Sequence, residues 1–232
     1  MAFDVYVGTM TRFYRREWEN VVQRASRLRG EQYKMIHAGG QPPAPPPAEE
    51  IREGVGHWCR WLDGCLGLGA AHVAPIRWDE DDKKPYFTDR PGWRGYCGTL
   101  LWAAYADHPE MPPPTALPET WADDPAFQRS VAPGGKTLCR AILEPELWLP
   151  VELPGVFRAP TLMSENETCI GSTFALRDQL SQLAARTGDR LQQRTNPPED
   201  DSLCAWADFG LGMFIALATH ACDHRLPMML HY

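Results

Sequence analysis

The sequence predicts an α+β fold in which about five helices pack on a small, mainly antiparallel sheet within a single domain, residues 1–232. Two observations lead to this class. Several long stretches repeat their apolar residues at helical spacing, whereas short stretches near both ends and near position 150 are rich in strand-forming residues. No repeat of fixed period accompanies them, so a solenoid or propeller is not expected.

The N-terminal elements are a strand and a helix. Residues Phe3 to Val7 alternate, which predicts a strand with Asp4 and Tyr6 on one face and the odd-numbered residues on the other. The stretch Arg12 to Arg29 carries apolar residues at helical spacing and predicts one amphipathic helix lying on a core. Gly30 is a plausible helix end.

The next third of the chain is predicted to be mostly helical. A short strand is expected over Tyr33–Ile36, and the proline-rich run 39–47 is interpreted as a stiff surface loop rather than a ligand for a recognition domain. Helices are predicted from Ala48 to Leu66 and from Gly95 to Ala106, separated by an irregular segment, 75–93. The first of these helices has an apolar stripe, formed by Ile51, Val55, Trp58, Leu62 and Leu66.

Prolines and three short apolar stretches define the region that follows. Five prolines between positions 109 and 118 predict a long loop, and a short helix is expected over Asp124–Ser130. We expect strands over Leu147–Val151 and Gly155–Ala159, paired with each other, and a third over Thr168–Ile170.

The C-terminal third is predicted to contain two helices and a final strand. Ser172 is a suitable N-cap for a helix reaching about Leu191. The stretch Ser202–His224 is apolar nearly all round, which is typical of a central, buried helix. Met228–Leu230 is expected to return as a strand.

The composition excludes several protein classes. Hydrophobic residues make up 44% of the 232 positions, too many for a disordered chain. The 30 aspartates and glutamates outnumber the 23 lysines and arginines, giving a net charge of −7. This balance argues against nucleic-acid binding, which needs clustered positive charge, but it suits a basic protein partner.

Neither a secretory signal nor membrane attachment is expected. The first residues contain no basic region followed by an apolar run. The longest apolar run, Phe209 to Ala218, has ten residues, whereas a membrane span needs about 20. The seven cysteines form no Cys-x-x-Cys pair, which favours small buried hydrophobes in a reducing compartment. We therefore expect a soluble cytoplasmic protein.

Well-known catalytic motifs are missing from the sequence. The run Gly134–Thr137 has the ending of a phosphate-binding loop, but Ser130 stands where its first glycine is needed. Neither a dinucleotide-binding glycine motif, a Gly-x-Ser-x-Gly elbow nor a His-Glu-x-x-His motif occurs. We therefore predict neither a cofactor nor a metal, and no catalytic residue can be assigned.

Two features leave an enzymatic alternative open. His220 and His224 share one helical face, a spacing that suits two metal ligands, although histidines at a helix end more often interact with its last carbonyl groups. Asp208 falls inside the most apolar stretch and is either a catalytic acid with a raised pKa or a carboxylate paired with a cation. A metal-assisted hydrolase is the alternative built on these residues.

The irregular segment 75–93 combines acidic and aromatic side chains. Interfaces use aromatic residues as anchors and charge to steer the partner, so the part of this segment from Trp78 to Trp93 is the predicted partner-binding site. An alternative is that the aromatic residues cover the core beneath a solvated loop. The predicted binding residues are Trp78, Asp79, Glu80, Asp81, Asp82, Tyr86, Asp89 and Trp93.

Two stretches resemble a family of uncharacterised bacterial cytoplasmic proteins. They are Pro85–Trp93 and His224–Met228 with the ending at Tyr232, and the opening Phe3–Trp18 accompanies them. In size, acidity and lack of motifs the chain is similar to immunity proteins, which neutralise secreted bacterial toxins. The resemblance implies a protein-binding module that occludes the active site of a toxin, with a basic toxin domain as partner and no nucleic acid or membrane.

Overall fold

The computed structural model of the chain describes residues 3–32, 44–67, 75–135, 137–187 and 196–232. The fold is α+β, as predicted, with one six-stranded sheet of order β2-β1-β6-β3-β5-β4. The strands are β1 (Asp4–Val7), β2 (Phe87–Asp89), β3 (Leu147–Leu149), β4 (Phe157–Thr161), β5 (Ser164–Ser172) and β6 (Met228–His231). The helices are α1 (Met10–Arg15), α2 (Val21–Leu28), α3 (Ala48–Leu66), α4 (Gly92–Asp107), α5 (Pro125–Val131), α6 (Arg140–Leu143), α7 (Thr173–Thr187) and α8 (Leu203–His224), with a 3₁₀ turn at Trp121–Asp123.

Two details of the predicted architecture need correction. The described residues form eight α-helices rather than about five, because the chain contains short helices that the periodicity did not separate. The sheet is mixed: β3 and β5 are parallel, and the other neighbouring strands are antiparallel. The predicted strand at Tyr33–Ile36 lies outside the described residues.

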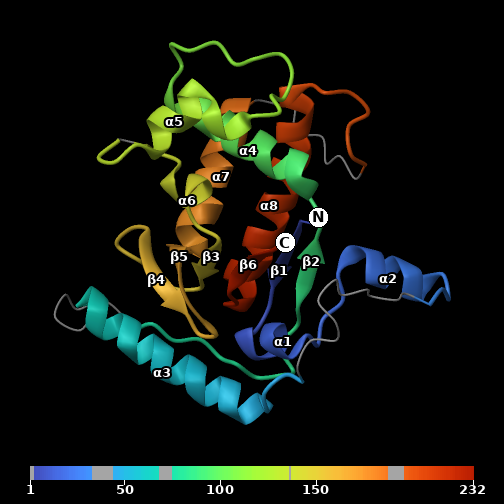
Figure 1. The fold of residues 1–232 in the computed structure, drawn as a ribbon, viewed down its shortest axis with the longest axis vertical. Coiled ribbons are helices and arrows are strands. Elements are labelled where there is room, and N and C mark those ends of the chain that lie inside the picture. Colours follow the sequence, from blue (N-terminus) through green and yellow to red (C-terminus); the bar gives the residue numbers. More distant parts are fainter. Residues whose placement is uncertain (1–2, 33–43, 68–74, 136, 188–195) are drawn as a thin grey trace.

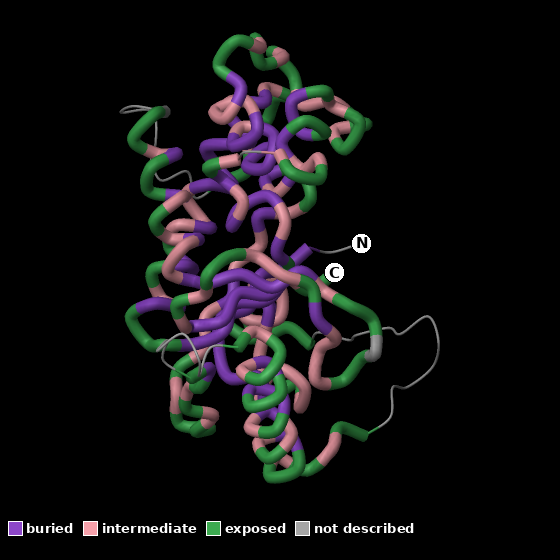
Figure 2. Tube along the Cα trace, turned by 90° about the vertical axis from the view of Figure 1, so that its left-hand side faces the viewer, coloured by how far each residue is buried: buried purple, intermediate pink, exposed green. Residues whose placement is uncertain are grey.

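The sheet separates two apolar cores (Figures 1 and 2). Helices α4, α7 and α8 cover one face, where Val5 and Val7 of β1, with Phe3 just before it, lie in the same cluster as the apolar residues of these helices. Helices α1 and α3 cover the other face, which receives Tyr6. The alternation predicted for the first strand is therefore confirmed for these residues, and both faces of the sheet are buried.

The predicted long N-terminal helix is wrong, because the chain breaks it into α1 and α2. Arg16 ends α1 in the left-handed conformation with φ = 59°. Asn20 then starts a new helix through a capping box, in which the Gln23 N–H donates to Asn20 Oδ1 at 2.9 Å and Gln23 Oε1 accepts from the Asn20 N–H at 2.8 Å. The second helix does not lie on a core, since Ser26 is its one buried residue and Leu28 is 74% exposed.

Helix α3 has the predicted bounds, and its apolar stripe packs on the face that α1 also covers. Ile51, Val55, Trp58 and Leu62 are buried there, and Leu66 packs against them half-buried. The Trp58 Nε1–H donates to the Pro160 carbonyl in β4 at 2.9 Å, which ties the helix to the far edge of the sheet.

Helices α4 and α8 cross at glycines on the opposite face. A Cβ atom on Gly210 would lie 2.1 Å from the Gly95 carbonyl oxygen, and one on Gly98 would lie 2.9 Å from the Ala207 backbone nitrogen. Only glycine permits backbones to approach this closely. The crossing makes α8 the central, mostly buried helix that the sequence predicts.

The strands predicted around position 150 form but do not pair with each other. Strand β5 lies between β3 and β4, parallel to the first and antiparallel to the second. Only two residues separate β4 from β5, so these two strands form a hairpin. Strand β4 lies at the end of the sheet, and β3 pairs with the other side of β5. Ser172 caps α7 as predicted, accepting from the Ala175 N–H at 3.4 Å.

All seven cysteines are free thiols, and five of them are buried. Burial raises the pKa of the Cys59, Cys97 and Cys139 thiols to about 12, which keeps them protonated and unreactive at neutral pH. The prediction of small buried hydrophobes is confirmed for the five buried cysteines, whereas Cys65 is exposed.

Candidate functional site

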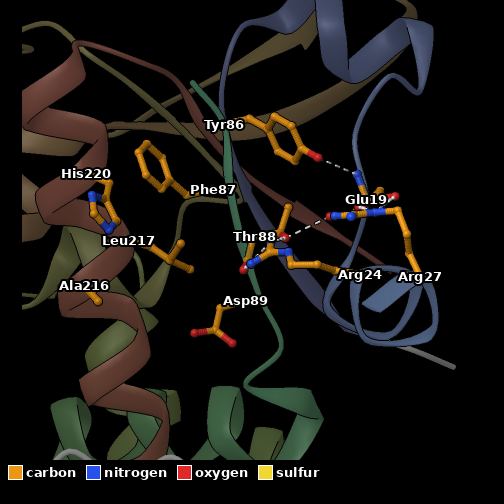
Figure 3. A pocket seen from close by; sticks show the side chains of 10 residues that line it. All are labelled: Glu19, Arg24, Arg27, Tyr86, Phe87, Thr88, Asp89, Ala216, Leu217 and His220. Atoms are coloured by element: carbon orange, nitrogen blue, oxygen red, sulfur yellow. Dashed lines mark hydrogen bonds and ion pairs between the residues drawn. The ribbon is translucent and has the colours of Figure 1, made fainter. Parts of the chain in front are cut away.

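A groove of about 420 Å³ lies at the edge of the sheet beside β2 (Figure 3). Strand β2 forms its floor, with α8 on one side and α2 on the other. Its volume falls in the range of ligand-binding clefts. Polar and apolar side chains line it together: Glu19, Arg24, Arg27, Tyr86, Phe87, Thr88, Asp89, Ala216, Leu217 and His220.

The position of the groove follows from the place of β2 in the sheet. Strand β2 is the end strand of the order and pairs with β1 on one side only. It is kept in place by the residue that follows it, because the Arg90 guanidinium donates to both oxygens of the buried Asp4 carboxylate, at 2.7 and 3.0 Å. The free edge of β2 therefore faces the groove.

Helix α2 is tied to this edge through Thr88. Arg24 donates through Nη2 to the Thr88 hydroxyl at 2.5 Å and to its carbonyl at 3.5 Å. The Thr88 hydroxyl in turn donates to the Glu19 carbonyl at 2.9 Å, and the Glu19 N–H donates to the Tyr86 hydroxyl at 3.3 Å. These polar contacts, rather than an apolar core, hold the wall that α2 provides.

The charges in the groove are only partly balanced. Arg27 is neutralised by Glu19, whose two oxygens accept from Arg27 Nε at 2.9 and 3.0 Å. Arg24, by contrast, donates to neutral oxygens, and within the described part of the chain no carboxylate pairs with it. Asp89 accepts from the Arg90 N–H at 2.8 Å and has no cation partner among the described residues.

The α8 wall of the groove is a flat stack of two rings. Phe87 of β2 and His220 of α8 lie with their centroids 3.9 Å apart and their planes 2° from parallel. His224 lies 6.3 Å from His220, ring to ring. In the residues that the structure describes, no group of three histidine, cysteine or acidic side chains could hold a metal ion.

Of the predicted binding residues, Tyr86 and Asp89 line the groove. Glu80 has a structural role at the start of α1, where its two oxygens accept from the Met10 N–H at 3.0 Å and the Thr11 N–H at 2.7 Å. Trp78 also donates to Glu80 and packs half-buried against the core beneath. The interpretation as a loop covering the core therefore describes these two residues.

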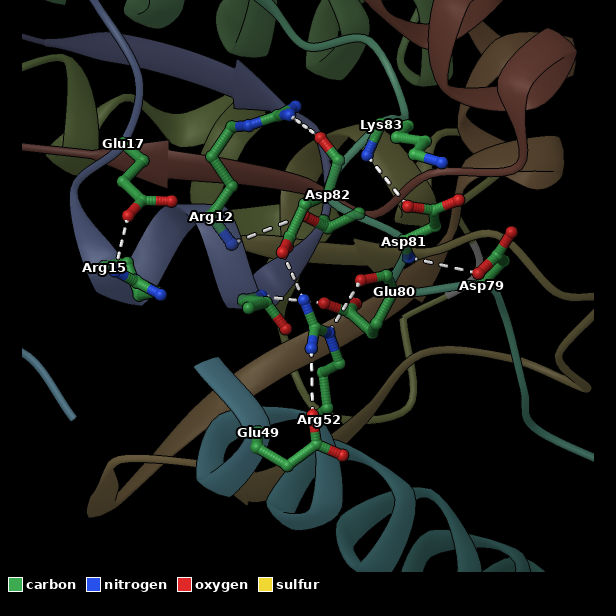
Figure 4. A network of polar contacts seen from close by, with 12 residues as sticks. Arg12, Arg15, Glu17, Glu49, Arg52, Asp79, Glu80, Asp81, Asp82 and Lys83 are labelled. Atoms are coloured by element: carbon green, nitrogen blue, oxygen red, sulfur yellow. Dashed lines mark hydrogen bonds and ion pairs between the residues drawn. The ribbon is translucent and has the colours of Figure 1, made fainter. Parts of the chain in front are cut away.

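Two arginines fasten the acidic loop, residues 79–82, to helices α1 and α3 (Figure 4). Arg12 donates to the carbonyls of Asp82 and Lys84, and its guanidinium lies 5.1 Å from the Tyr86 ring centroid. Arg52 of α3 pairs with the Asp82 carboxylate and with Glu49. Asp82 thus anchors the loop as well as contributing surface charge.

Asp79 and Asp81 are exposed acids of the loop that, unlike Asp82, do not pair with Arg52. Each accepts a backbone N–H two residues onward, from Asp81 at 3.0 Å and from Lys83 at 2.9 Å. Asp79 also lies 3.5 Å from the Lys84 ammonium, with 63% of its side chain exposed. Their carboxylates are available to solvent in a way that Glu80 is not.

Trp93 lies apart from the groove, at the start of α4. It is 39% exposed and packs against Phe3, Tyr96 and Tyr232, with the nearest ring centroid at 4.9 Å. The predicted set therefore does not form one surface: it divides between the acidic loop, the groove and this aromatic cluster.

Sequence reasoning missed three groove residues: Glu19, which precedes α2, and Arg24 and Arg27 on α2. They were assigned to one long helix, and the signal that separates them is the Asn20–Gln23 capping pair, which the sequence does contain. The residues of the enzymatic alternative divide as well. His220 lines the groove, whereas Asp208 is buried in α8 and does not.

Comparisons with known proteins give no family for the chain. No protein-family model matches it, and neither a curated protein nor a solved structure does. One described helix, α8, is long and apolar enough to cross a membrane by length and composition alone. Half of its most apolar window is buried against the rest of the fold, as in the core helix of a globular protein.

Proposed function

We propose that this chain is a protein-binding module whose partner docks in the groove between α2 and α8. The observation that carries this proposal is the pair of unbalanced charges, Arg24 and Asp89, beside the free edge of β2. Half-buried charges without counter-ions cost solvation free energy, which a partner of opposite charge can recover. An aromatic wall beside them offers the kind of surface that anchors partners.

The acidic loop supports a basic partner. Asp79 and Asp81 are exposed, and the chain as a whole carries a net charge of −7. Such a field raises the association rate of positively charged proteins. The narrower form of the proposal is an immunity protein in the bacterial cytoplasm, which would occlude the active site of a basic toxin domain. It is supported by the charge, the resemblance noted above and the lack of a catalytic motif.

The experiment is a quantitative affinity capture from the organism that encodes the chain. The native protein is compared with a groove variant, Arg24→Met with Asp89→Asn, which removes both unbalanced charges at little change in size. The matched control is Arg177→Met with Asp178→Asn, because these residues form an exposed ion pair on α7. Captured proteins are quantified by mass spectrometry.

One stoichiometric partner, recovered by the native protein and the control but lost with the groove variant, is the expected result. Equal recovery by both variants would exclude the groove as the binding site, and no stoichiometric partner would exclude the module itself. The immunity function additionally requires that the partner is toxic and that the chain inhibits it. A harmless partner contradicts that narrower proposal alone.

A further inference from the structure

The groove side of β2 presents backbone groups suited to another strand. The Thr88 carbonyl faces the groove, where the contact recorded for its oxygen among the described residues is a long one of 3.5 Å from Arg24. In an antiparallel pair the N–H and C=O of one residue point to the same neighbour, so the Thr88 N–H faces the groove too. A hydrogen bond of 3.5 Å is weak. At Thr88 the edge therefore offers an added strand two backbone groups. The N–H is a hydrogen-bond donor, and the carbonyl is an acceptor that can exchange its weak contact with Arg24 for a bond to the added strand.

The unbalanced charges lie on opposite sides of this strand. Thr88 contacts Arg24 and α2, whereas Phe87 stacks on His220 of α8. Asp89 shares the face of Phe87, because side chains two apart in a strand point the same way, and Figure 3 shows it on the α8 side of β2. A segment running along the edge would project its own successive side chains toward these two sides in turn.

We propose that the groove binds an extended segment of a partner protein as a short strand added to β2, and that this segment carries an acidic residue directly beside a basic one. The acidic side chain pairs with Arg24 and the basic side chain with Asp89. This inference rests on the proposed function and specifies the chemistry of the partner. Strand addition to a sheet edge, with side chains selecting the sequence, is an established way of recognising peptides.

Two features of the groove fit this occupant. A carboxylate that pairs with the Arg24 fork draws the guanidinium away from the Thr88 carbonyl, which frees this carbonyl for the incoming strand. On the other side, Leu217 and the stack of Phe87 on His220 provide apolar surface along which the stem of a lysine can lie while its ammonium reaches Asp89.

The test uses four heptapeptides with blocked ends that differ only in their central pair. The pairs are Glu-Lys, Glu-Gln, Gln-Lys and Gln-Gln, each in the same frame of threonine and valine. We expect the Glu-Lys peptide to bind about tenfold more tightly than the Gln-Gln peptide, with each charge contributing a few-fold. Calorimetry gives the Kd values, and amide exchange of Thr88 must slow in the complex if a strand has been added.

Variants assign each preference to its residue. Arg24→Met should abolish the preference for glutamate and keep that for lysine, and Asp89→Asn should do the reverse. Arg177→Met is the control, because Arg177 pairs with Asp178 on α7, does not line the groove and should leave both preferences intact. Free glutamate and free lysine serve as competitors.

Equal binding of the four peptides, no binding at all, or preferences that survive both variants would overturn the inference. So would competition by the free amino acids as strong as by the peptide, since that indicates a small zwitterionic ligand, or unchanged exchange of Thr88. If the groove variant loses its captured partner while the peptides fail, the inference falls and the proposed function stands. If capture does not depend on the groove, the proposed function itself fails.

Discussion

At the scale of single residues, Glu80 shows how an acidic residue that looks like surface charge can be structural. Its carboxylate accepts two backbone N–H groups at the first turn of α1 and the indole N–H of Trp78. Orphan N–H groups at a helix start need such acceptors. The sequence could not distinguish Glu80 from its neighbours, because the helix that it caps lies about 70 residues earlier in the chain.

Removing the Glu80 carboxylate should destabilise the fold. We expect Glu80→Ala to lower the free energy of unfolding by about 2 kcal/mol, because charge-assisted hydrogen bonds in a half-buried site are lost. Urea denaturation followed by tryptophan fluorescence measures the change. Glu53→Ala, at an exposed position of α3, is the control and should stay within about 0.5 kcal/mol of the native protein. A Glu80 variant as stable as this control would refute the structural role.

His231 should make stability depend on pH. Partial desolvation against Phe13 and Trp18, whose rings meet it edge-on, lowers the pKa of this imidazole below its ordinary 6.5, while Asp4 opposes the shift and Arg16 adds to it. A histidine with a lowered pKa in the folded state binds fewer protons than in the unfolded state. The contribution of neutral His231 to the free energy of unfolding is therefore present above pH 6.5 and is lost as the pH falls below that value.

Thermal unfolding of the native protein and of His231→Gln between pH 5 and pH 8 tests this dependence. The difference between the two melting temperatures should shift in favour of the variant as the pH falls, because glutamine cannot bind a proton. A difference that stays constant across this range would show that His231 does not titrate with folding.

At the scale of elements, the crossing of α4 and α8 depends on the absence of side chains at specific glycines. Gly210→Ala places a Cβ 2.1 Å from the Gly95 carbonyl oxygen, so the helices must separate, and we expect a loss of about 1–3 kcal/mol. Gly212→Ala, two positions along, meets nothing within 4 Å and should gain up to about 1 kcal/mol from helix propensity. Chemical denaturation distinguishes the two, and equal effects would contradict the close crossing.

Helices were predicted best from the sequence where the apolar spacing was not interrupted by a capping residue. Helix α3 lies where the sequence predicts a helix over about 48–66, because its stripe faces one core and no capping signal interrupts it. The helix predicted over Arg12–Arg29 failed because its periodicity continued across Asn20, whose side chain competes for the backbone and begins a separate helix. Strand partners were not predictable from alternation, since β5 enters between β3 and β4 through contacts that no local pattern encodes.

At the scale of the whole molecule, the proposed function gives the acidic loop and the groove separate roles in binding. The loop is held by Arg12 and Arg52 and presents Asp79 and Asp81 to solvent, while the groove provides unbalanced charge at a sheet edge. The binding residues predicted from the sequence include the acids of the loop and two residues that line the groove, Tyr86 and Asp89. Sequence reasoning could not find the site as a unit, because the walls come from segments about 200 residues apart in the chain, joined only by the fold.

Charge reversal of the exposed acids should slow association without altering the bound complex. With a basic partner, Asp79→Lys together with Asp81→Lys is expected to lower the association rate about fivefold at low salt and to weaken its salt dependence, with little change in dissociation. Stopped-flow mixing measures both rates. Glu119→Lys with Asp123→Lys changes the net charge equally at exposed positions outside the loop. If this control slowed association as much, net charge rather than the loop would steer the partner.

Hydrogen–deuterium exchange of the captured complex tests the central claim most directly, because it maps the contact without altering the chain. The account predicts that partner binding slows exchange in residues 19–28, 86–89 and 216–220, the segments that form the groove. Slowed exchange confined to α3 or to the cluster around Trp93, with these three segments unchanged, would contradict the assignment of the groove as the binding site.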